Sequence, residues 1–224
     1  MARALNVLSV LVSDRDDFER AEALWEESLA LGRKPGDRLR VRAVLLNMGY
    51  VEVVRGDFER AEALFEESLA ISRESKDPHA NSEDLLGLGT LATRRGDHGR
   101  AKTLLEESLV LSRRLGTMVN VAECLETLAE MAGTLGDPPR AARLWGAADA
   151  LREATGSPWM SFEKSLHEPY LAAARSGMDE ADWTKAWEVG RAMTLEDAIA
   201  YALEDTEEQE LPTTGGPPLG GPLA

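Results

Sequence analysis

The sequence has little that could form a disulfide or cross a membrane. Its 224 residues include one cysteine, Cys124, so no disulfide can form within the chain, and a lone cysteine is typical of a reducing compartment. No apolar run approaches the roughly 18 residues that a membrane span requires. The apolar stretch 4–12 is interrupted by Asn6 and Ser9 and precedes a charged run, which argues against a signal peptide. These features predict a cytoplasmic protein.

Positive charge is also scarce. Lys and Arg total 25 against 40 Asp and Glu, which gives a formal net charge of −15. Phosphate backbones are bound by clustered Lys and Arg. The composition therefore disfavours direct contact with nucleic acid, and it favours a partner that carries a basic segment.

Residue types that form catalytic or metal-binding sets are sparse. The three histidines, His79, His98 and His167, form no i, i+4 pair and have no nearby cysteine in the sequence. No Gly-x-x-x-x-Gly-Lys-Ser/Thr phosphate loop is present, so nucleotide hydrolysis is not predicted. Cys124 lies in an apolar-periodic segment, which suits a small core residue better than a thiol nucleophile. The sequence predicts no catalytic residue, no cofactor and no metal.

Aromatic residues make up only 5% of the chain and β-branched residues are few, whereas Ala and Leu are abundant. This balance favours helix over sheet. Within it, one block of sequence recurs at an interval of about forty residues, at 17–29, 57–69, 97–109 and 137–149. Apolar and small residues in the blocks follow spacings of three and four, which indicates helices with one buried face.

A helix-ending signal stands at the start of the last three blocks. A Gly-Asp pair stands at 56–57, 96–97 and 136–137. Glycine can adopt the left-handed conformation that ends one helix, and Asp is a good N-cap for the next. Each unit is therefore predicted to be a helical hairpin, and the stacked hairpins a solenoid.

This pattern resembles the tetratricopeptide repeat over roughly residues 1–155. Small residues stand in register in the first helix of a pair at Gly49, Gly89 and Ala129, and in the second at Ala21, Ala61, Ala101 and Ala141. The period exceeds the usual 34 residues, so the helices are expected to be longer. The resemblance implies an all-α, α-α superhelix of about four long hairpins that binds proteins and is not an enzyme.

Beyond Thr155 the period fails. Helices are predicted at 159–176, 179–192 and 195–203, the last with Thr194 as its N-cap, and together they would form a helical cap on the solenoid. The remaining segment is acidic and then rich in Gly and Pro, which is typical of a disordered tail. The predicted division is a repeat array at 1–155, capping helices at 156–204 and a tail at 205–224.

The segments 141–152 and 186–198 resemble the C-terminal repeat region of large bacterial LuxR-type or predicted-ATPase transcriptional regulators. That resemblance implies the sensor or regulatory part of a bacterial signalling regulator. Two alternatives stay open: a free-standing scaffold or adaptor, and the regulatory tail of an ATPase or nucleotide cyclase. If the array is cut from a longer one, Leu5, Leu8 and Leu11 lack a preceding hairpin, which predicts self-association through the N-terminal repeat.

The tetratricopeptide resemblance also implies a concave groove that is lined by the first helix of each pair and binds a protein or peptide. The residues predicted to be exposed there are Asn47, Tyr50, Val54, Glu83, Thr90, Arg94, Glu123, Glu126 and Glu130. The groove runs from mixed to acidic, which suits a helix or extended peptide with a basic segment anchored at Tyr50. The alternative is that these are ordinary solvated positions.

Overall fold

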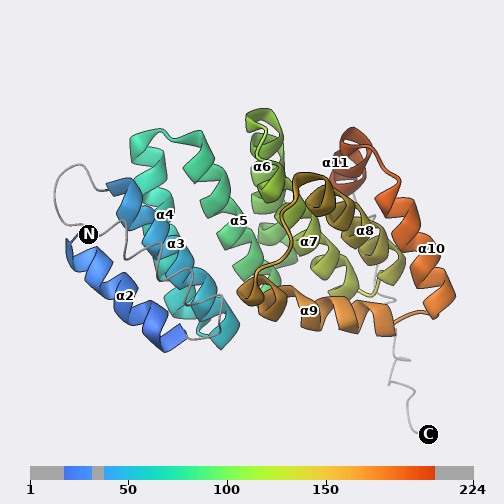
Figure 1. Cartoon of the computed structure of the whole chain (residues 1–224), viewed down its shortest axis with the longest axis horizontal. Coiled ribbons are helices and arrows are strands. Elements are labelled where there is room, and N and C mark those ends of the chain that lie inside the picture. Colours follow the sequence, from blue (N-terminus) through green and yellow to red (C-terminus); the bar gives the residue numbers. More distant parts are fainter. Residues whose placement is uncertain (1–17, 32–37, 205–224) are drawn as a thin grey trace, which may run out of the picture.

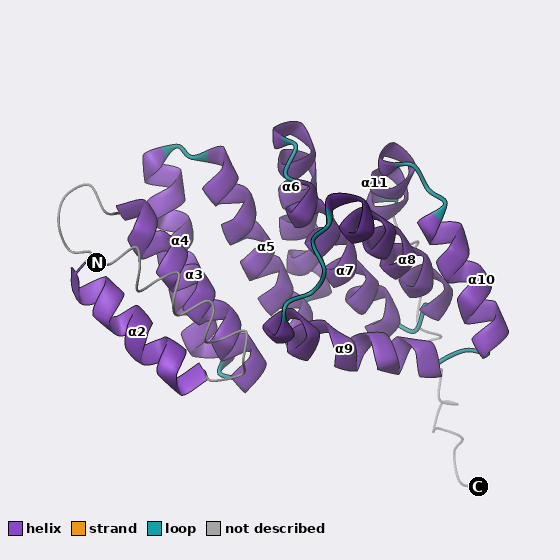
Figure 2. Cartoon of the chain, in the orientation of Figure 1, coloured by secondary structure: helices purple, strands orange, loops and turns teal. Residues whose placement is uncertain are grey.

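The computed structural model describes residues 18–31 and 38–204, and helices make up most of both ranges (Figures 1 and 2). No strand occurs in these ranges. The helices are α2 (Phe18–Leu31), α3 (Arg38–Arg55), α4 (Phe58–Ser75), α5 (Pro78–Arg95), α6 (His98–Leu115), α7 (Met118–Thr134), α8 (Pro138–Thr155), α9 (Ser161–Ser176), α10 (Glu180–Arg191) and α11 (Leu195–Leu203).

The helices from α3 to α8 form three antiparallel hairpins that stack side by side. The largest contacts in this part of the chain join α3 to α4, α5 to α6 and α7 to α8, and smaller contacts join each hairpin to the next. Helix α2 packs on α3 as the second helix of an earlier hairpin, whose predicted first helix lies outside the described residues. The predicted all-α superhelix of helical hairpins is confirmed.

Tight turns recur about every twenty residues. The backbone is left-handed at Gly56, Lys76, Gly96, Gly116, Gly136 and Gly156, with φ between 54° and 82°. The residue that follows each of these positions donates its backbone N–H to the carbonyl five residues before it, as Asp97 N–H does to Ala92 O at 3.0 Å. This hydrogen bond caps the C-terminal end of the helix. The Asp97 carboxylate then accepts from Arg100 N–H at 3.1 Å, which starts the next helix. The two-residue turns and helices of about 18 residues explain the long period.

Lys76 is the described non-glycine residue with a left-handed backbone, at φ 54°. We expect Lys76→Gly to raise the free energy of unfolding by about 0.5–1 kcal/mol, because glycine removes the steric cost of this conformation while losing more chain entropy on folding. Urea denaturation would measure the change. Gly116→Ala, at the same turn one repeat later, should destabilise instead, and a loss of stability in Lys76→Gly would contradict the argument.

Small residues allow the two helices of a hairpin to approach closely. A Cβ added to Gly49 would collide with the Phe65 ring, and one added to Gly89 would lie 2.7 Å from Leu105 Cδ2. Phe65 and Leu105 occupy the same place in successive repeats and are fully buried. The repeat is therefore a matched pair of a small residue on the first helix and a large apolar residue on the second.

The stack is curved, with its first helices on the inside. Helix α3 contacts α5 and α5 contacts α7, whereas α4 and α6 share almost no contact, nor do α6 and α8. The first helices of neighbouring hairpins contact each other directly, whereas the second helices hardly do. Helices α3, α5 and α7 therefore lie on the concave side of the stack. This arrangement agrees with the tetratricopeptide geometry expected from the sequence.

The last three helices follow the sequence-based bounds closely. Helix α9 begins two residues after the predicted start, α10 is one residue shorter at each end, and α11 spans the predicted 195–203. Thr194 Oγ1 accepts from Asp197 N–H at 3.1 Å, as its N-cap prediction requires. Helix α10 lies along α8 at the end of the stack, whereas α9 packs on α7 and runs across the lower side of the array in Figure 1.

No helix in the described ranges is both long and apolar enough to span a membrane. The predicted tail at 205–224 and the leucines predicted to self-associate, Leu5, Leu8 and Leu11, lie outside the described residues.

Candidate functional site

The concave surface carries the chain's own helix α9. Leu166 of α9 is buried in the same apolar cluster as Leu85 and Leu88 of α5. Nearer the start of α9, the Phe162 ring lies 6.4 Å from the Tyr50 ring of α3. Since α9 also packs on α7, it meets all three first helices on their shared face. The centre of the predicted groove is therefore filled.

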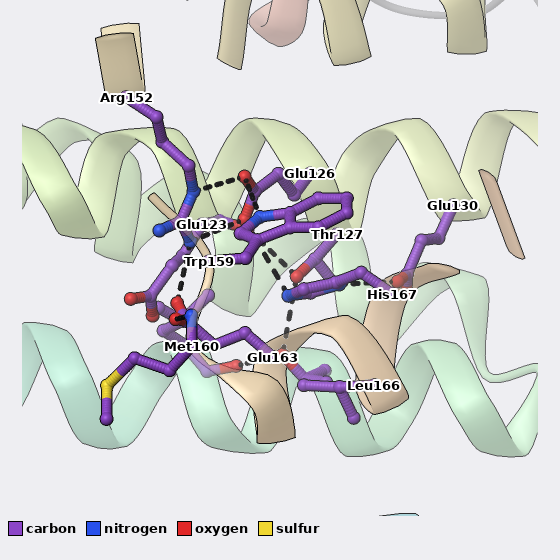
Figure 3. A network of polar contacts seen from close by, with 12 residues as sticks. Glu123, Glu126, Thr127, Glu130, Arg152, Trp159, Met160, Glu163, Leu166 and His167 are labelled. Atoms are coloured by element: carbon purple, nitrogen blue, oxygen red, sulfur yellow. Dashed lines mark hydrogen bonds and ion pairs between the residues drawn. The ribbon is translucent and has the colours of Figure 1, made fainter. Parts of the chain in front are cut away.

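One part of this contact is centred on Arg152, at the C-terminal end of α8 (Figure 3). Its Nη2 donates to Glu126 Oε2 of α7 at 2.9 Å and to Glu163 Oε1 of α9 at 2.8 Å. Glu126 Oε1 also accepts from Trp159 Nε1 at 2.8 Å, and Glu163 Oε2 accepts from the Met160 backbone N–H at 2.7 Å. Arg152 thereby joins α7, α8 and the start of α9.

The second part is centred on Glu130, one turn further along α7. Its Oε1 lies 2.6 Å from His167 Nδ1 of α9, and its Oε2 lies 2.8 Å from Arg94 Nη1 of α5. Arg94 Nη2 also donates to the Leu166 carbonyl at 2.6 Å, and the Arg94 guanidinium lies 3.6 Å from the centre of the Tyr170 ring. This set of contacts ties the middle of α9 to α5 and α7.

The charged groups of both parts are withdrawn from water. Glu126 and Glu130 are each 1% exposed, His167 is 3% exposed and Arg152 is 6% exposed. Buried ions cost solvation energy that partners of opposite charge must offset, so breaking such a pair is strongly destabilising. In its observed position α9 gives Arg94, Glu130 and Arg152 partners through the Leu166 carbonyl, His167 and Glu163, and this pairing favours that position on the concave surface.

Three groups of the charged cluster that these two parts form on α5, α7, α8 and α9 have shifted pKa values: Glu123, His167 and Arg152. Burial, then the nearby carboxylates of Glu163 and Glu126, raise the pKa of Glu123 to about 8. Burial lowers the pKa of His167, but Glu130 and Glu126 outweigh it, so that the pKa is raised above its ordinary value. Burial opposes the charge on Arg152, yet the bonds and charge of Glu126 raise its pKa. At neutral pH the cluster therefore holds a protonated Glu123 beside an ionised Arg152.

We expect Glu123→Gln to reduce the decrease in the free energy of unfolding that occurs as the pH rises. The pKa of Glu123 is about 8 in the folded chain against an ordinary value of 4.5, so its contribution is fully present below pH 4.5 and is lost as the pH rises through 8. Between pH 5 and pH 9 the variant should lose about 2–4 kcal/mol less free energy of unfolding than the wild type.

Urea denaturation at both pH values would measure this difference. The raised pKa of His167 gives a loss of the same sign, so some pH dependence should persist in the variant. Glu67→Gln, at an exposed position of α4, should keep the wild-type profile. Equal pH dependence in Glu123→Gln and the wild type would contradict the prediction.

The structure corrects part of the predicted groove. Thr90, Glu126 and Glu130 are buried, and the Arg94 side chain is 3% exposed, so the prediction that these four side chains are exposed is wrong. The physical reason is that α9 packs on α5 and α7, where its Leu166 carbonyl and His167 pair with Arg94 and Glu130. Glu126 instead pairs with Arg152 of α8 and with Trp159, and Thr90 donates to the Leu86 carbonyl of its own helix. The other five positions are partly exposed: Asn47, Tyr50, Val54, Glu83 and Glu123.

Sequence reasoning missed the residues that come from outside the groove: Arg152, Trp159, Glu163 and His167. The sequence did contain two indications of this contact. Glu123, Glu126 and Glu130 gave an acidic face without counter-charges on its own helix, and a later segment carried Leu166, His167 and Tyr170 at helical spacing. Neither fact by itself shows that the two surfaces meet.

Cys124 lies beneath this surface and is fully buried. Burial raises the pKa of its thiol to about 12, so the nucleophilic thiolate is scarce at neutral pH. The structure agrees with the prediction that Cys124 is a core residue.

The tetratricopeptide repeat family model matches residues 1–74 and 40–113. The chain belongs to the tetratricopeptide repeat family. The family has a non-catalytic protein-interaction fold, and the stacked hairpins with a concave face of first helices have the arrangement expected of it.

Three mycobacterial proteins are similar to part of this chain. They are "Putative HTH-type transcriptional regulator Mb0914c" of Mycobacterium bovis and the like-named MT0914 and Rv0890c of two Mycobacterium tuberculosis strains, each 34% identical over 73 residues. The matched segment spans 33% of this chain and 8% of each relative. No solved structure matches the chain significantly. The similarity is consistent with a tetratricopeptide repeat region like those of bacterial regulators.

Proposed function

We propose that the chain is a non-enzymatic protein-interaction module that serves as the sensor or regulatory repeat region of a bacterial signalling or transcriptional regulator. The observation that carries the interaction role is the stack of tetratricopeptide hairpins, since this family's fold is a non-catalytic interaction fold. The regulatory role rests on the similarity to HTH-type regulators over 73 residues. A cytoplasmic location follows from that role.

The proposed partner is a protein or peptide with a basic segment. It would bind at the part of the concave surface that α9 leaves partly exposed, which includes Asn47, Tyr50, Val54 and Glu83. The Glu83 side chain is 42% exposed, and the chain carries a net charge of −15, so a basic segment meets a favourable field. Tyr50 would supply an aromatic anchor. A partner reaches Arg94, Glu126 and Glu130 only by displacing α9.

The proposed division of the chain keeps an array at 1–155, further helices at 156–204 and a tail at 205–224. Leu166 and His167 of the second part are buried against the array. We therefore propose that the helices at 156–204 fold only with the array present, and that the array keeps its concave surface partly covered by α9.

A peptide titration tests the proposed interaction site. The probes are two 16-residue amphipathic helical peptides, one of Leu and Lys and one of Leu and Glu, added in isothermal titration calorimetry. We expect the Lys peptide to bind and the Glu peptide not to bind. Tyr50→Ala should weaken binding about tenfold, as the loss of an interface anchor does. Glu67→Gln, at an exposed site on α4 away from the concave side, should change the affinity little.

Equal binding of both peptides, or an unchanged affinity in Tyr50→Ala, would contradict the proposed site. The regulatory role has its own test in the coding sequence on both sides of this segment. A phosphate loop or a helix-turn-helix in the same reading frame supports the regulator, whereas a cyclase domain there, or no further domain, supports the alternatives of an enzyme's regulatory tail or a free-standing adaptor. A specific catalytic turnover by the chain would overturn the non-enzymatic proposal.

A further inference from the structure

A pocket of about 550 Å³ lies where the end of α8, the turn after it, α9 and α10 meet. Its walls include three indole rings, those of Trp145, Trp159 and Trp187, together with Leu171 and Pro158. This volume is in the range of small-molecule sites, which are mostly apolar with a few polar groups. The pocket is separate from the partly exposed surface around Tyr50, because none of the α3 residues line it.

The aromatic walls are held in place by their own contacts. The Trp159 ring meets Trp145 edge to face at 5.6 Å and stacks on His167 at 5.7 Å. Trp159 Nε1 donates to the buried Glu126. A pocket whose walls are fixed in this way loses little conformational freedom when a flat molecule enters. Trp159 and Trp187 are nevertheless partly exposed, so their faces stay accessible.

Most of the charged groups around the pocket already have partners. Arg152 and Glu126 bind each other at the inner wall. At the rim, Asp149 and Glu153 of α8 both pair with Arg191 of α10. Three carboxylates and two guanidinium groups leave these five residues with a formal net charge of −1.

One cation at the pocket is left over. Lys164 of α9 is exposed at the rim, and its ammonium forms no ion pair within the described part of the chain. A ligand that carries acceptor oxygens would give this ammonium a partner.

We propose that this pocket binds a small aromatic carboxylate. The apolar ring would lie among Trp145, Trp159 and Trp187, and the carboxylate would face the Lys164 ammonium. This ligand site goes beyond the protein-interaction role and does not depend on it. Since Trp159 also bonds Glu126, a bound ligand contacts the same residue that ties the start of α9 to the concave surface.

The test compares two probes that share a ring and differ in charge, 1-naphthylacetate and protonated 1-naphthylmethylamine. Each is titrated into the ¹⁵N-labelled full chain while the indole N–H signals of its five tryptophans are followed by NMR. We expect 1-naphthylacetate to bind with a sub-millimolar Kd, about tenfold more tightly than the amine, and to move the signal that Trp145→Phe removes.

Two variants locate the site and its charge preference. Lys164→Gln should remove most of the preference for the carboxylate, whereas Lys185→Gln, at an exposed position of α10 outside the pocket, should keep it. Leu171→Trp places a larger ring in the pocket and should abolish binding. The absence of saturable binding, unchanged binding in Leu171→Trp, or tighter binding of the amine would each overturn the proposal, the last by indicating a cation site at Asp149 and Glu153.

Discussion

Arg152→Met is expected to lower the free energy of unfolding by about 3–5 kcal/mol, because it leaves buried carboxylates without their cation. Arg152 is 6% exposed and bonds both Glu126, which is 1% exposed, and Glu163, which is 7% exposed. Methionine has a similar length but provides no donor. The two carboxylates must then take up protons or draw in water, and α9 loses its strongest attachment to α7 and α8.

Urea denaturation followed by tryptophan fluorescence would measure this loss, and hydrogen exchange would show whether α9 opens first. The matched control is Arg175→Met, the same substitution on α9 at an exposed pair with Glu180, which should have no measurable effect. The double variant Arg152→Met/Glu126→Gln should recover part of the loss, because one uncompensated charge is removed as well. A loss in Arg152→Met no larger than in Arg175→Met would show that the cluster does not hold α9.

Gly190→Ala is expected to lower the free energy of unfolding by about 1–3 kcal/mol and to move α10 away from α8. A Cβ at Gly190 would lie 2.7 Å from the Arg143 carbonyl carbon of α8 and 2.9 Å from its Cα. Gly146 of α8 faces α10 in the same way, since a Cβ there would lie 3.0 Å from the Trp187 carbonyl carbon. The obstructing atoms belong to the backbone, so a side-chain rotation cannot relieve the collision.

The same urea denaturation would measure this effect. Gly99→Ala is the matched control, because Gly99 lies in α6 with no atom within 4 Å of an added Cβ. That variant should be neutral or stabilised by up to about 1 kcal/mol, since alanine favours helix over glycine. Gly146→Ala should resemble Gly190→Ala, and the double variant should cost less than the sum, since one displacement of α10 relieves both collisions. Wild-type stability in Gly190→Ala would contradict this close crossing.

The position of α9 changes the expectation for how a partner binds. A groove lined by α3, α5 and α7 would offer its whole length, but Leu166 and His167 occupy its middle with their own buried contacts. The partly exposed residues near Tyr50 then form the accessible end. A partner that displaces α9 must replace Trp159 at Glu126 and His167 at Glu130, which is a demanding requirement for a buried acidic surface.

The sequence by itself determined the local structure of this protein. The Gly-Asp turns, the small residues at Gly49 and Gly89, and the N-cap at Thr194 act within a few residues or between the two helices of one hairpin, so their pattern repeats with the chain and can be read from it. These short-range rules predicted the hairpins and placed the bounds of the last three helices within two residues. They also gave the face on which Glu126 and Glu130 lie.

Only the tertiary structure decided whether that face meets water. Leu166 and His167 lie far along the chain from the helices that they cover, and no repeat fixes where a segment outside the array docks. Its place depends on burying apolar surface against α5 and on pairing every buried ion, a condition that involves Arg94, Arg152 and His167 together with both glutamates. Because such pairing is a property of the assembled surfaces and not of any one helix, the predicted open groove proved to be largely covered.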